Sequence, residues 1–408
     1  MKKSLQGKNI LIIFDFLELG GGTRVNLNML KALSHEANVF LLTGIFKSSL
    51  NRPLLKQARN SCEKVYFYNL KPSKSYLKTC FTIALNTKKL ITKILSKHEI
   101  DYIFLNLTSS GLGFLLSSIS KKLKVMFFFH GALTLERESL YSKKDLRQWK
   151  LLARIRFKLA NVFFFHLQKI ILKKVDLIFV FSDFSKQILI NYFKLSSHNI
   201  EKINPPIFID EDKLKSITRK DISVSNKDFL IVIGSRLEPR KGVHLLLKAI
   251  KFFNEIKNTI NIKVFILGPS DRIEYYFSLW DYYFRHSLYK NVFFLGAIKH
   301  DDVLKYFKLA DLTILPSAQY ETLGLTTLES LILNTPVLGF RSGATPELLG
   351  RVNDDLIVNS LSIKSLAKKI KWYTMLTNKK KQLIKKNCAL LKKSYSQKAF
   401  LKSLTKYL

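Results

Sequence analysis

The chain has 408 residues, of which 47% are hydrophobic and 24% are charged. This length and composition exclude a disordered chain and predict a globular protein of about two domains. The net charge of +38 predicts an anionic partner, and nucleic acid, an anionic membrane and an acidic substrate all remain open. A lysine-rich genome composition is a fourth explanation. Three scattered cysteines exclude a disulfide framework and indicate a reducing cytosol.

The N-terminal segment is expected to form a strand, a glycine loop and a helix. The apolar run from Asn9 to Phe16 predicts the strand, and Asp15 within it argues against a secretory signal peptide. Gly21 and Gly22 belong to the loop that follows, and Thr23 is expected to cap the helix. Such a glycine loop can hold a phosphate or serve as a simple tight turn, and the pattern alone leaves both open.

Strands and helices alternate through the rest of the first half, which predicts a parallel, doubly wound sheet. His130 follows the strand expected at Val125 to Phe129, at the edge where such sheets bind ligands, although a single histidine is more often structural. The uncharged window from Tyr102 to Ser120 is long enough to cross a bilayer. Its polar residues and glycines favour a strand, a turn and a short helix instead.

The segment from Leu146 to Lys174 is expected to be a long basic helix. Its cations include Arg147, Lys150, Arg154 and Arg156. Further basic residues are interleaved with phenylalanines along the rest of the segment. Such a helix can lie on an anionic membrane. An ordinary domain helix with a solvated basic face fits the pattern equally well.

The polar segment from Asp210 to Asp228 is expected to connect two domains. The acidic string Asp210 to Asp212 could hold a divalent cation, but its position in a connection and the absence of an accompanying ligand cluster in the sequence argue against a metal site. The apolar run that begins at Phe229 predicts a buried strand, and the loop after it carries Arg236 and Lys241. Both side chains are suited to contact a phosphate.

The run from Ala310 to Pro316 predicts another buried strand, and Gly324 is expected to open the next helix. Glu321 would lie in the loop before this helix and Glu329 about two turns into it, so both carboxylates can point towards one ligand. The backbone N–H groups at the helix start suit a diphosphate.

The string from Pro316 to Val337 resembles the signature of the retaining glycosyltransferase family 4, which has the GT-B fold. The resemblance implies that Glu321 contacts the transferred sugar and that Glu329 holds the nucleotide ribose. It also implies that the amides of Gly324 and Leu325 hold the diphosphate.

Other positions resemble the same family. Here the resemblance implies that His130 contacts the donor sugar, and that Arg236 and Lys241 stabilise the leaving diphosphate. It also implies that the loop with Gly21 and Gly22 borders the donor and the acceptor.

The fold class that the resemblance implies is α/β GT-B, with two doubly wound, Rossmann-like domains facing each other across a cleft. Residues 1–205 would form the acceptor-side domain, completed by the last helix at about residues 390–408. Residues 206–389 would form the nucleotide-sugar domain, in which Gly343 to Leu349 matches a loop near the family's donor site.

The function implied is transfer of a hexose from a nucleotide-diphosphate sugar to a cell-envelope glycan, as in polysaccharide or lipopolysaccharide biosynthesis, or to a lipid-linked acceptor. Transfer would proceed with retention and without a metal or cofactor. We expect a cytoplasmic protein, with peripheral attachment to the cytoplasmic face of the inner membrane as a further expectation. The alternatives are a non-catalytic GT-B-like scaffold and a basic protein that binds nucleic acid or membrane. Nucleic acid is disfavoured because no nucleic-acid motif is present and lysine far outnumbers arginine.

Overall fold

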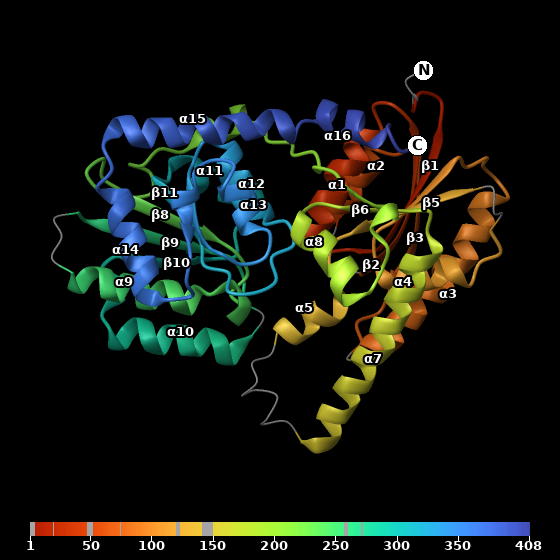
Figure 1. Cartoon of the computed structure of the whole chain (residues 1–408), viewed down its shortest axis with the longest axis horizontal. Coiled ribbons are helices and arrows are strands. Elements are labelled where there is room, and N and C mark those ends of the chain that lie inside the picture. The colour runs from red at the N-terminus through yellow and green to blue at the C-terminus, as the bar shows by residue number, and fades with distance from the viewer. Residues whose placement is uncertain are drawn as a thin grey trace. The chain divides into compact units, whose positions relative to one another are not determined.

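The computed structural model describes residues 5–18, 20–46, 52–73, 75–119, 123–140, 150–256, 260–270 and 272–408. The chain divides into two compact α/β units (Figure 1). The first comprises Met1–Arg137, Lys144–Phe208 and Tyr395–Leu408, and the second comprises Glu138–Lys143 and Ile209–Ser394.

The first unit contains one parallel sheet, in which the seven described strands have the order β3-β2-β1-β4-β5-β6-β7. The strands are β1 (Asn9–Leu17), β2 (Asn38–Phe46), β3 (Lys64–Leu70), β4 (Tyr102–Leu105), β5 (Lys124–Phe129), β6 (Leu177–Val180) and β7 (Ile200–Lys202). Strand order reverses between β1 and β4, and ligands of open parallel sheets bind beyond the carboxyl ends of the strands at such a reversal.

Helices connect these strands. They are α1 (Gly21–Leu33), α2 (Arg52–Arg59), α3 (Tyr76–Leu95), α4 (Thr108–Leu115), α5 (Leu133–Ser139), α7 (Leu151–Lys174), α8 (Asp183–Gln187) and α16 (Gln397–Leu404). The uncharged window from Tyr102 to Ser120 contains β4 and α4, as the sequence predicted. In the described part of the chain, no helix is both long and apolar enough to span a membrane.

The second unit contains a second parallel sheet, in which the six described strands have the order β10-β9-β8-β11-β12-β13. The strands are β8 (Phe229–Gly234), β9 (Ile262–Leu267), β10 (Val292–Gly296), β11 (Leu312–Leu315), β12 (Val337–Phe340) and β13 (Ile357–Val358). Every residue of β8 and β11 is buried, because helices cover both faces of a parallel sheet. The order reverses between β8 and β11.

The helices of the second unit are α9 (Val243–Glu255), α10 (Ile273–Arg285), α11 (His300–Leu309), α12 (Leu325–Ile332), α13 (Thr345–Leu349), α14 (Ile363–Thr374) and α15 (Asn378–Ser394). Helices α10 and α14 contact α9, whereas α11 and α15 contact α12. Figure 1 shows these two groups on opposite sides of the sheet.

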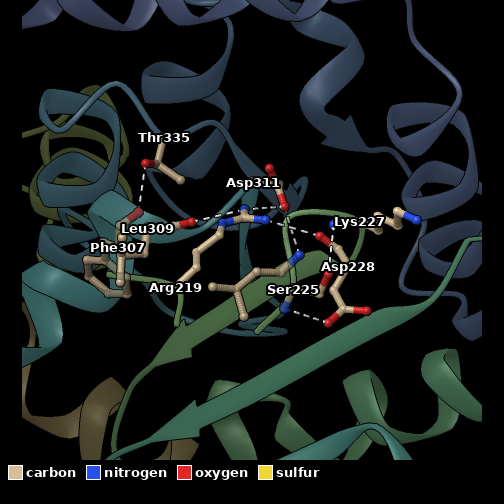
Figure 2. Close-up of polar contacts among 9 residues, drawn as sticks. Arg219, Ser225, Lys227, Asp228, Phe307, Leu309, Asp311 and Thr335 are labelled. Carbon is tan, nitrogen blue, oxygen red and sulfur yellow. Dashed lines mark hydrogen bonds and ion pairs between the residues drawn. The ribbon is translucent and has the colours of Figure 1, made fainter. Parts of the chain in front are cut away.

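The segment from Asp210 to Asp228, predicted to be an inter-domain connection, packs as part of the second unit. Leu214 and Val224 are buried in the core of this unit. Arg219 pairs with Asp311 at 2.6 Å, and the same Asp311 oxygen accepts from the backbone N–H of Leu230 at 2.8 Å (Figure 2). The prediction was wrong because the polar composition of the segment conceals two core residues and an ion pair.

Asp228 and Asp311 come directly before β8 and β11, so this network lies at the amino edge of the sheet. Arg219 also donates to the carbonyls of Asp228 and Leu309, each at 3.1 Å (Figure 2). Its contacts fix the starts of the two central strands. The opposite, carboxyl edge carries the loops in which the sequence analysis placed Arg236, Lys241 and Glu321.

Candidate functional site

Two loops of the second unit meet at the carboxyl edge of its sheet. One follows β8 and the other follows β11, and the backbone N–H of Ala318 in the second loop donates to the carbonyl of Arg240 in the first at 3.1 Å. Gly242 has a φ of +71°, and a Cβ at this position would lie 1.9 Å from the carbonyl oxygen of Pro316. Only glycine permits this approach, so the two loops are held in one arrangement.

This arrangement brings Lys241 and Glu321 together. Lys241 Nζ lies 2.6 Å from Glu321 Oε2, and the two side chains are 15% and 13% exposed. Ser317 Oγ donates to the same oxygen at 3.4 Å.

The surroundings of Glu321 keep it ionised. Burial acts to raise the pKa of this carboxyl, but the charge and hydrogen bond of Lys241, the charge of Arg240 and the hydrogen bond from Ser317 hold the pKa below its usual value. Glu321 is therefore a carboxylate at neutral pH, and it can accept hydrogen bonds from hydroxyl groups.

The loop after β12 holds the backbone of Glu321. The N–H of Ala344 donates to the Glu321 carbonyl at 2.7 Å. Gly343 has a φ of +57°, and a Cβ there would lie 2.3 Å from the same carbonyl oxygen. The segment from Gly343 to Leu349, singled out in the sequence, thus begins in direct contact with Glu321.

Helix α12 begins shortly after Glu321. Gly324 is its N-cap, with a φ of +72°, and Leu325 is its first residue, so the predicted helix start is confirmed. The N–H of Leu328 makes a bond to the Gly324 carbonyl at 2.9 Å, so the N–H groups before it have no acceptor within the helix. These groups and the partial positive charge of the helix start can stabilise an anion.

The sequence analysis missed Glu238, a second buried carboxylate in the loop after β8. Its side chain is 6% exposed, and its two oxygens contact Arg236 Nε at 3.2 Å and Arg240 Nε at 2.8 Å. Arg236 is 45% exposed, so Glu238 holds one end of a guanidinium that also faces solvent. The alternating charges of the RLEPRK string were the available signal for this network.

His300 was also missed. Its Nε2 lies 2.8 Å from Oε1 of Glu329, whose side chain is 7% exposed. His300 is the first residue of α11 and Glu329 lies in α12, so the fold, and no local pattern, brings them together. One oxygen of the Glu329 carboxylate is therefore engaged by His300.

In the first unit, the glycine loop lies beside His130. A Cβ at Gly22 would lie 4.0 Å from His130 Nδ1. Helix α1 begins at Gly21 and has Gly20 as its N-cap, so the prediction that Thr23 caps this helix is wrong. The helix begins within the glycine run, and no side chain caps its first backbone N–H groups.

His130 is an uncharged side chain in a fixed loop. Burial lowers the pKa of His130 to about 4, so its ring is neutral at pH 7. Its Nε2 is buried and has no hydrogen-bond partner among the described residues. Gln168 of α7 fixes the following loop, because its amide donates to the Gly131 carbonyl at 3.1 Å and accepts from the N–H of Leu133 at 3.2 Å.

The basic segment predicted at Leu146 to Lys174 forms α7 in its described part. Arg154 and Arg156 are exposed on this helix, and Lys150 is its exposed N-cap residue. Arg147 lies outside the described residues.

The acidic string from Asp210 to Asp212 is engaged by lysines. Asp210 Oδ2 lies 3.1 Å from Lys213 Nζ, and Glu211 pairs with Lys392. Across the described ranges, no group of three or more His, Cys, Asp or Glu side chains is placed to hold a metal ion.

Comparison with known families gives a match that contains the loops of the second unit. Residues 215–389, which include both loops and α12, match the family described as Glycosyl transferases group 1. The chain is 30% identical over 131 residues to an uncharacterized glycosyltransferase, MJ1607, of Methanocaldococcus jannaschii, covering 32% of each chain.

A second relative of this chain is a GDP-mannose-dependent monoacylated alpha-(1-6)-phosphatidylinositol monomannoside mannosyltransferase of Corynebacterium glutamicum. It is 30% identical over 139 residues, which are 33% of this chain and 35% of the relative. The similarity thus spans about a third of the length of these two curated relatives.

Solved structures show that the likeness in fold extends beyond the group 1 segment. HepE of Anabaena, in complex with UDP and glucose, has a TM-score of 0.72 at 18% identity, and sucrose-phosphate synthase of Thermosynechococcus elongatus has a TM-score of 0.74 at 17% identity. Each comparison covers 98% of both chains. The GT-B fold class expected from the sequence is confirmed, whereas the narrower assignment to family 4 stays a prediction.

The neutral His130 ring predicts a loss of stability in mild acid. Its folded pKa of about 4 lies below the unfolded value of about 6.5, so only the unfolded state gains this proton as pH falls from 6.5 towards 4. Between pH 7 and pH 5, His130 alone should remove about 2 kcal/mol of stability. Urea unfolding of the parent chain and of His130→Asn at both pH values measures this difference.

The variant should lose about 2 kcal/mol less than the parent chain between these pH values. His244, whose pKa burial also lowers to about 4, is present in both chains and cancels in the comparison. Equal losses in the two chains would show that His130 is not buried in its neutral form.

Proposed function

We propose that this protein transfers a hexose from a nucleotide-diphosphate sugar to an acceptor of the cell envelope, with retention at the anomeric carbon. The observation that carries this proposal is the buried Lys241–Glu321 pair beside the start of α12, in a segment that matches the glycosyl transferases group 1 family. The complex of the structural neighbour HepE with UDP-glucose supports a nucleotide sugar as donor.

Cationic groups of the second unit would stabilise the departing diphosphate. The bond between the anomeric carbon and the diphosphate oxygen breaks, and the electron pair leaves with the diphosphate. Arg236, Lys241 and the N–H groups at Gly324 and Leu325 would offset this growing negative charge. The acceptor oxygen forms the new bond on the same face of the sugar, and its proton passes to the departing diphosphate oxygen, without a covalent intermediate on the protein.

Carboxylates of the same unit would orient the donor. Glu321, ionised at neutral pH, would accept hydrogen bonds from hydroxyls of the transferred sugar. Glu329 would hold the nucleotide ribose through the oxygen that His300 does not contact. Two fixed carboxylates at one edge of the sheet would set the position of the sugar relative to the leaving group.

In the first unit, His130 would contact the sugar and the loop with Gly21 and Gly22 would border the acceptor. Names of relatives support an acceptor of the cell envelope. One is the phosphatidylinositol mannoside mannosyltransferase, and another is a lipopolysaccharide 1,2-N-acetylglucosaminetransferase of Salmonella typhimurium, 23% identical over 137 residues. The alternative functions are a non-catalytic scaffold and a basic nucleic-acid-binding protein, and the buried charged pair supports catalysis over both.

Changing Glu321 to Gln should lower turnover by about 100-fold or more, because the side chain keeps its size but loses the charge that accepts sugar hydroxyls. The matched control is Glu255→Gln, which removes the glutamate of an exposed pair with Lys251. Both proteins should fold, as judged by circular dichroism, and the control should transfer sugar from a panel of nucleotide sugars at the parental rate. Parental turnover by Glu321→Gln would exclude Glu321 from the site.

We propose that transfer needs no metal or other cofactor, because Arg236, Lys241 and the α12 N–H groups supply positive charge where the diphosphate would bind. Transfer should therefore persist in excess EDTA. Loss of transfer in EDTA, with recovery on addition of Mg²⁺ or Mn²⁺, would show that a cation stabilises the leaving diphosphate instead.

We also propose that the first unit binds the cytoplasmic face of an anionic membrane, where a lipid-linked acceptor would lie. Helix α7 carries six basic residues and no acidic residue. Its solvent face also carries an apolar stripe with helical spacing. The stripe consists of Leu151, Leu152, Ile155, Leu159 and Val162, which are 44–69% exposed. Apolar side chains between cations suit the interface of an anionic bilayer.

Binding to vesicles should depend on the cations of this helix and on those that precede it in the sequence. Each cation near an anionic surface contributes about 1 kcal/mol, and the attraction is screened beyond about 8 Å at physiological salt. We expect sedimentation with anionic but not zwitterionic vesicles, and weaker binding at high salt. Changing Arg147, Lys150, Arg154 and Arg156 to glutamine should weaken binding by about 100-fold or more.

The control removes the same charge elsewhere, by changing four exposed lysines of α15 to glutamine: Lys379, Lys380, Lys385 and Lys386. This control should retain most of the binding. Equal losses in both variants would indicate attraction by net charge alone, and binding to neither lipid would exclude the membrane proposal. Competition by an unrelated RNA at physiological salt would favour the nucleic-acid alternative.

A further inference from the structure

Three uncharged polar side chains at the carboxyl edge of the first sheet have buried polar atoms without a hydrogen-bond partner among the described residues. Asn106 follows β4, His130 follows β5, and Asn26 lies one turn beyond Gly22 in α1. Asn106 is 1% exposed and Asn26 is 4% exposed.

Four polar atoms of these side chains lack partners. Both Oδ1 and Nδ2 of Asn106, Oδ1 of Asn26 and Nε2 of His130 are buried and make no hydrogen bond within the part of the chain that the structure describes. Buried polar groups are nearly always hydrogen-bonded, because an unpaired group loses its bonds to water and gains none. Several such atoms at one edge of a sheet indicate a place where a ligand completes the bonds.

The sheet register brings these residues to one edge. Leu105, the residue before Asn106, pairs with Ile13 of β1 on one side and with Phe127 of β5 on the other. Asn106 therefore leaves the sheet at the order reversal, between the ends of β1 and β5. By strand alternation, it extends the face of Phe104, and His130 extends the face of Phe128. The Phe104 and Phe128 rings are in contact, with centroids 5.3 Å apart.

Helix α1 reaches the same place. The start of this helix lies against His130, since a Cβ at Gly22 would be 4.0 Å from the ring. Asn26 is four residues beyond Gly22, so it shares the helix face of Gly22.

The side chains of this cluster are suited to bind uncharged hydroxyl groups. Both amides offer donors and acceptors, and the neutral imidazole of His130 offers one of each. None of the three brings a charge that would attract a phosphate or a carboxylate. The nearby Asp15 does not change this, because its two oxygens already accept from the N–H groups of Ser109 and Ser110 at 3.1 Å and 2.6 Å.

We propose that Asn26 and Asn106 extend the sugar contact proposed for His130 into a subsite for the hydroxyl groups of a neutral sugar or polyol. This inference rests on the proposed function, because it names the class of substrate that the first unit binds. The hydroxyls of the ligand take the place of the missing protein partners, so each amide that is unpaired in the free protein becomes paired on binding.

A stability measurement tests the subsite without any ligand. Asn106→Leu replaces the two unpaired atoms with methyl groups and keeps the number of side-chain heavy atoms, so we expect its Tm to match the parental value or to exceed it by on the order of 2–4 °C. The matched control is Asn161→Leu, because Asn161 is also a buried asparagine of the first unit but accepts from Arg137 Nε at 2.9 Å. The control should lower the Tm. An equal fall in both variants would show that Asn106 has a structural role and would overturn the proposal.

A binding measurement identifies the ligand. Free glucose, mannose and myo-inositol are compared with UDP-glucose and GDP-mannose by thermal shift. We expect at least one free polyol to bind the parent chain and Asn161→Leu, and to bind Asn106→Leu at least tenfold more weakly. If only the nucleotide sugars lose affinity, the hydroxyls belong to the donor.

Unchanged affinity of every probe for Asn106→Leu, or no binding of any probe to the parent chain, would overturn the subsite. This failure differs from failure of the proposed transfer. The transfer proposal depends on Glu321 and turnover, whereas the subsite depends on Tm and affinity at Asn106.

Discussion

The loops at the carboxyl edge of the second sheet are organised around the buried pair between Lys241 and Glu321. A buried ion pair is stable only when its geometry is held closely, because removing two charges from water costs several kcal/mol per ion. Here the backbone supplies that geometry. Gly242 lets one loop reach Pro316, and Gly343 lets another reach the Glu321 carbonyl, so both glycines serve the same pair. The pair in turn fixes the position of Lys241, which can bind an anionic group, and of Glu321, which can accept a hydrogen bond from a hydroxyl.

Features that depend on local pattern were predictable from the sequence. The buried strand β8 follows from a continuous apolar run, and the start of α12 follows from Gly324 and the helical spacing after it. Contacts between distant elements were not predictable, because His300 does not stand out until the fold places it beside Glu329. The sequence could therefore indicate which edges of the sheets matter, but not the full set of side chains there.

Two errors had a common physical cause. The segment from Asp210 to Asp228 has a polar composition, yet Leu214, Val224 and the pair of Arg219 with Asp311 attach it to the second unit. In the glycine run, a capping side chain was expected at Thr23, yet the helix begins at Gly21. Composition describes the average environment of a segment, whereas single buried side chains and backbone geometry decide where it packs.

The two units differ in the charge of the side chains at the carboxyl edges of their sheets. In the second unit, Arg236, Arg240 and Lys241 pair with the two carboxylates of Glu238 and Glu321, so positive charge is left for a diphosphate. In the first unit, Asn26, Asn106 and His130 have neutral polar atoms that no described residue pairs with, which lowers the stability of the free protein. An apolar residue at any of these positions would remove that cost, so a packed core alone gives no reason for them. A binding site for hydroxyl groups does give a reason for these residues, because their polar atoms form the missing hydrogen bonds only when the ligand binds.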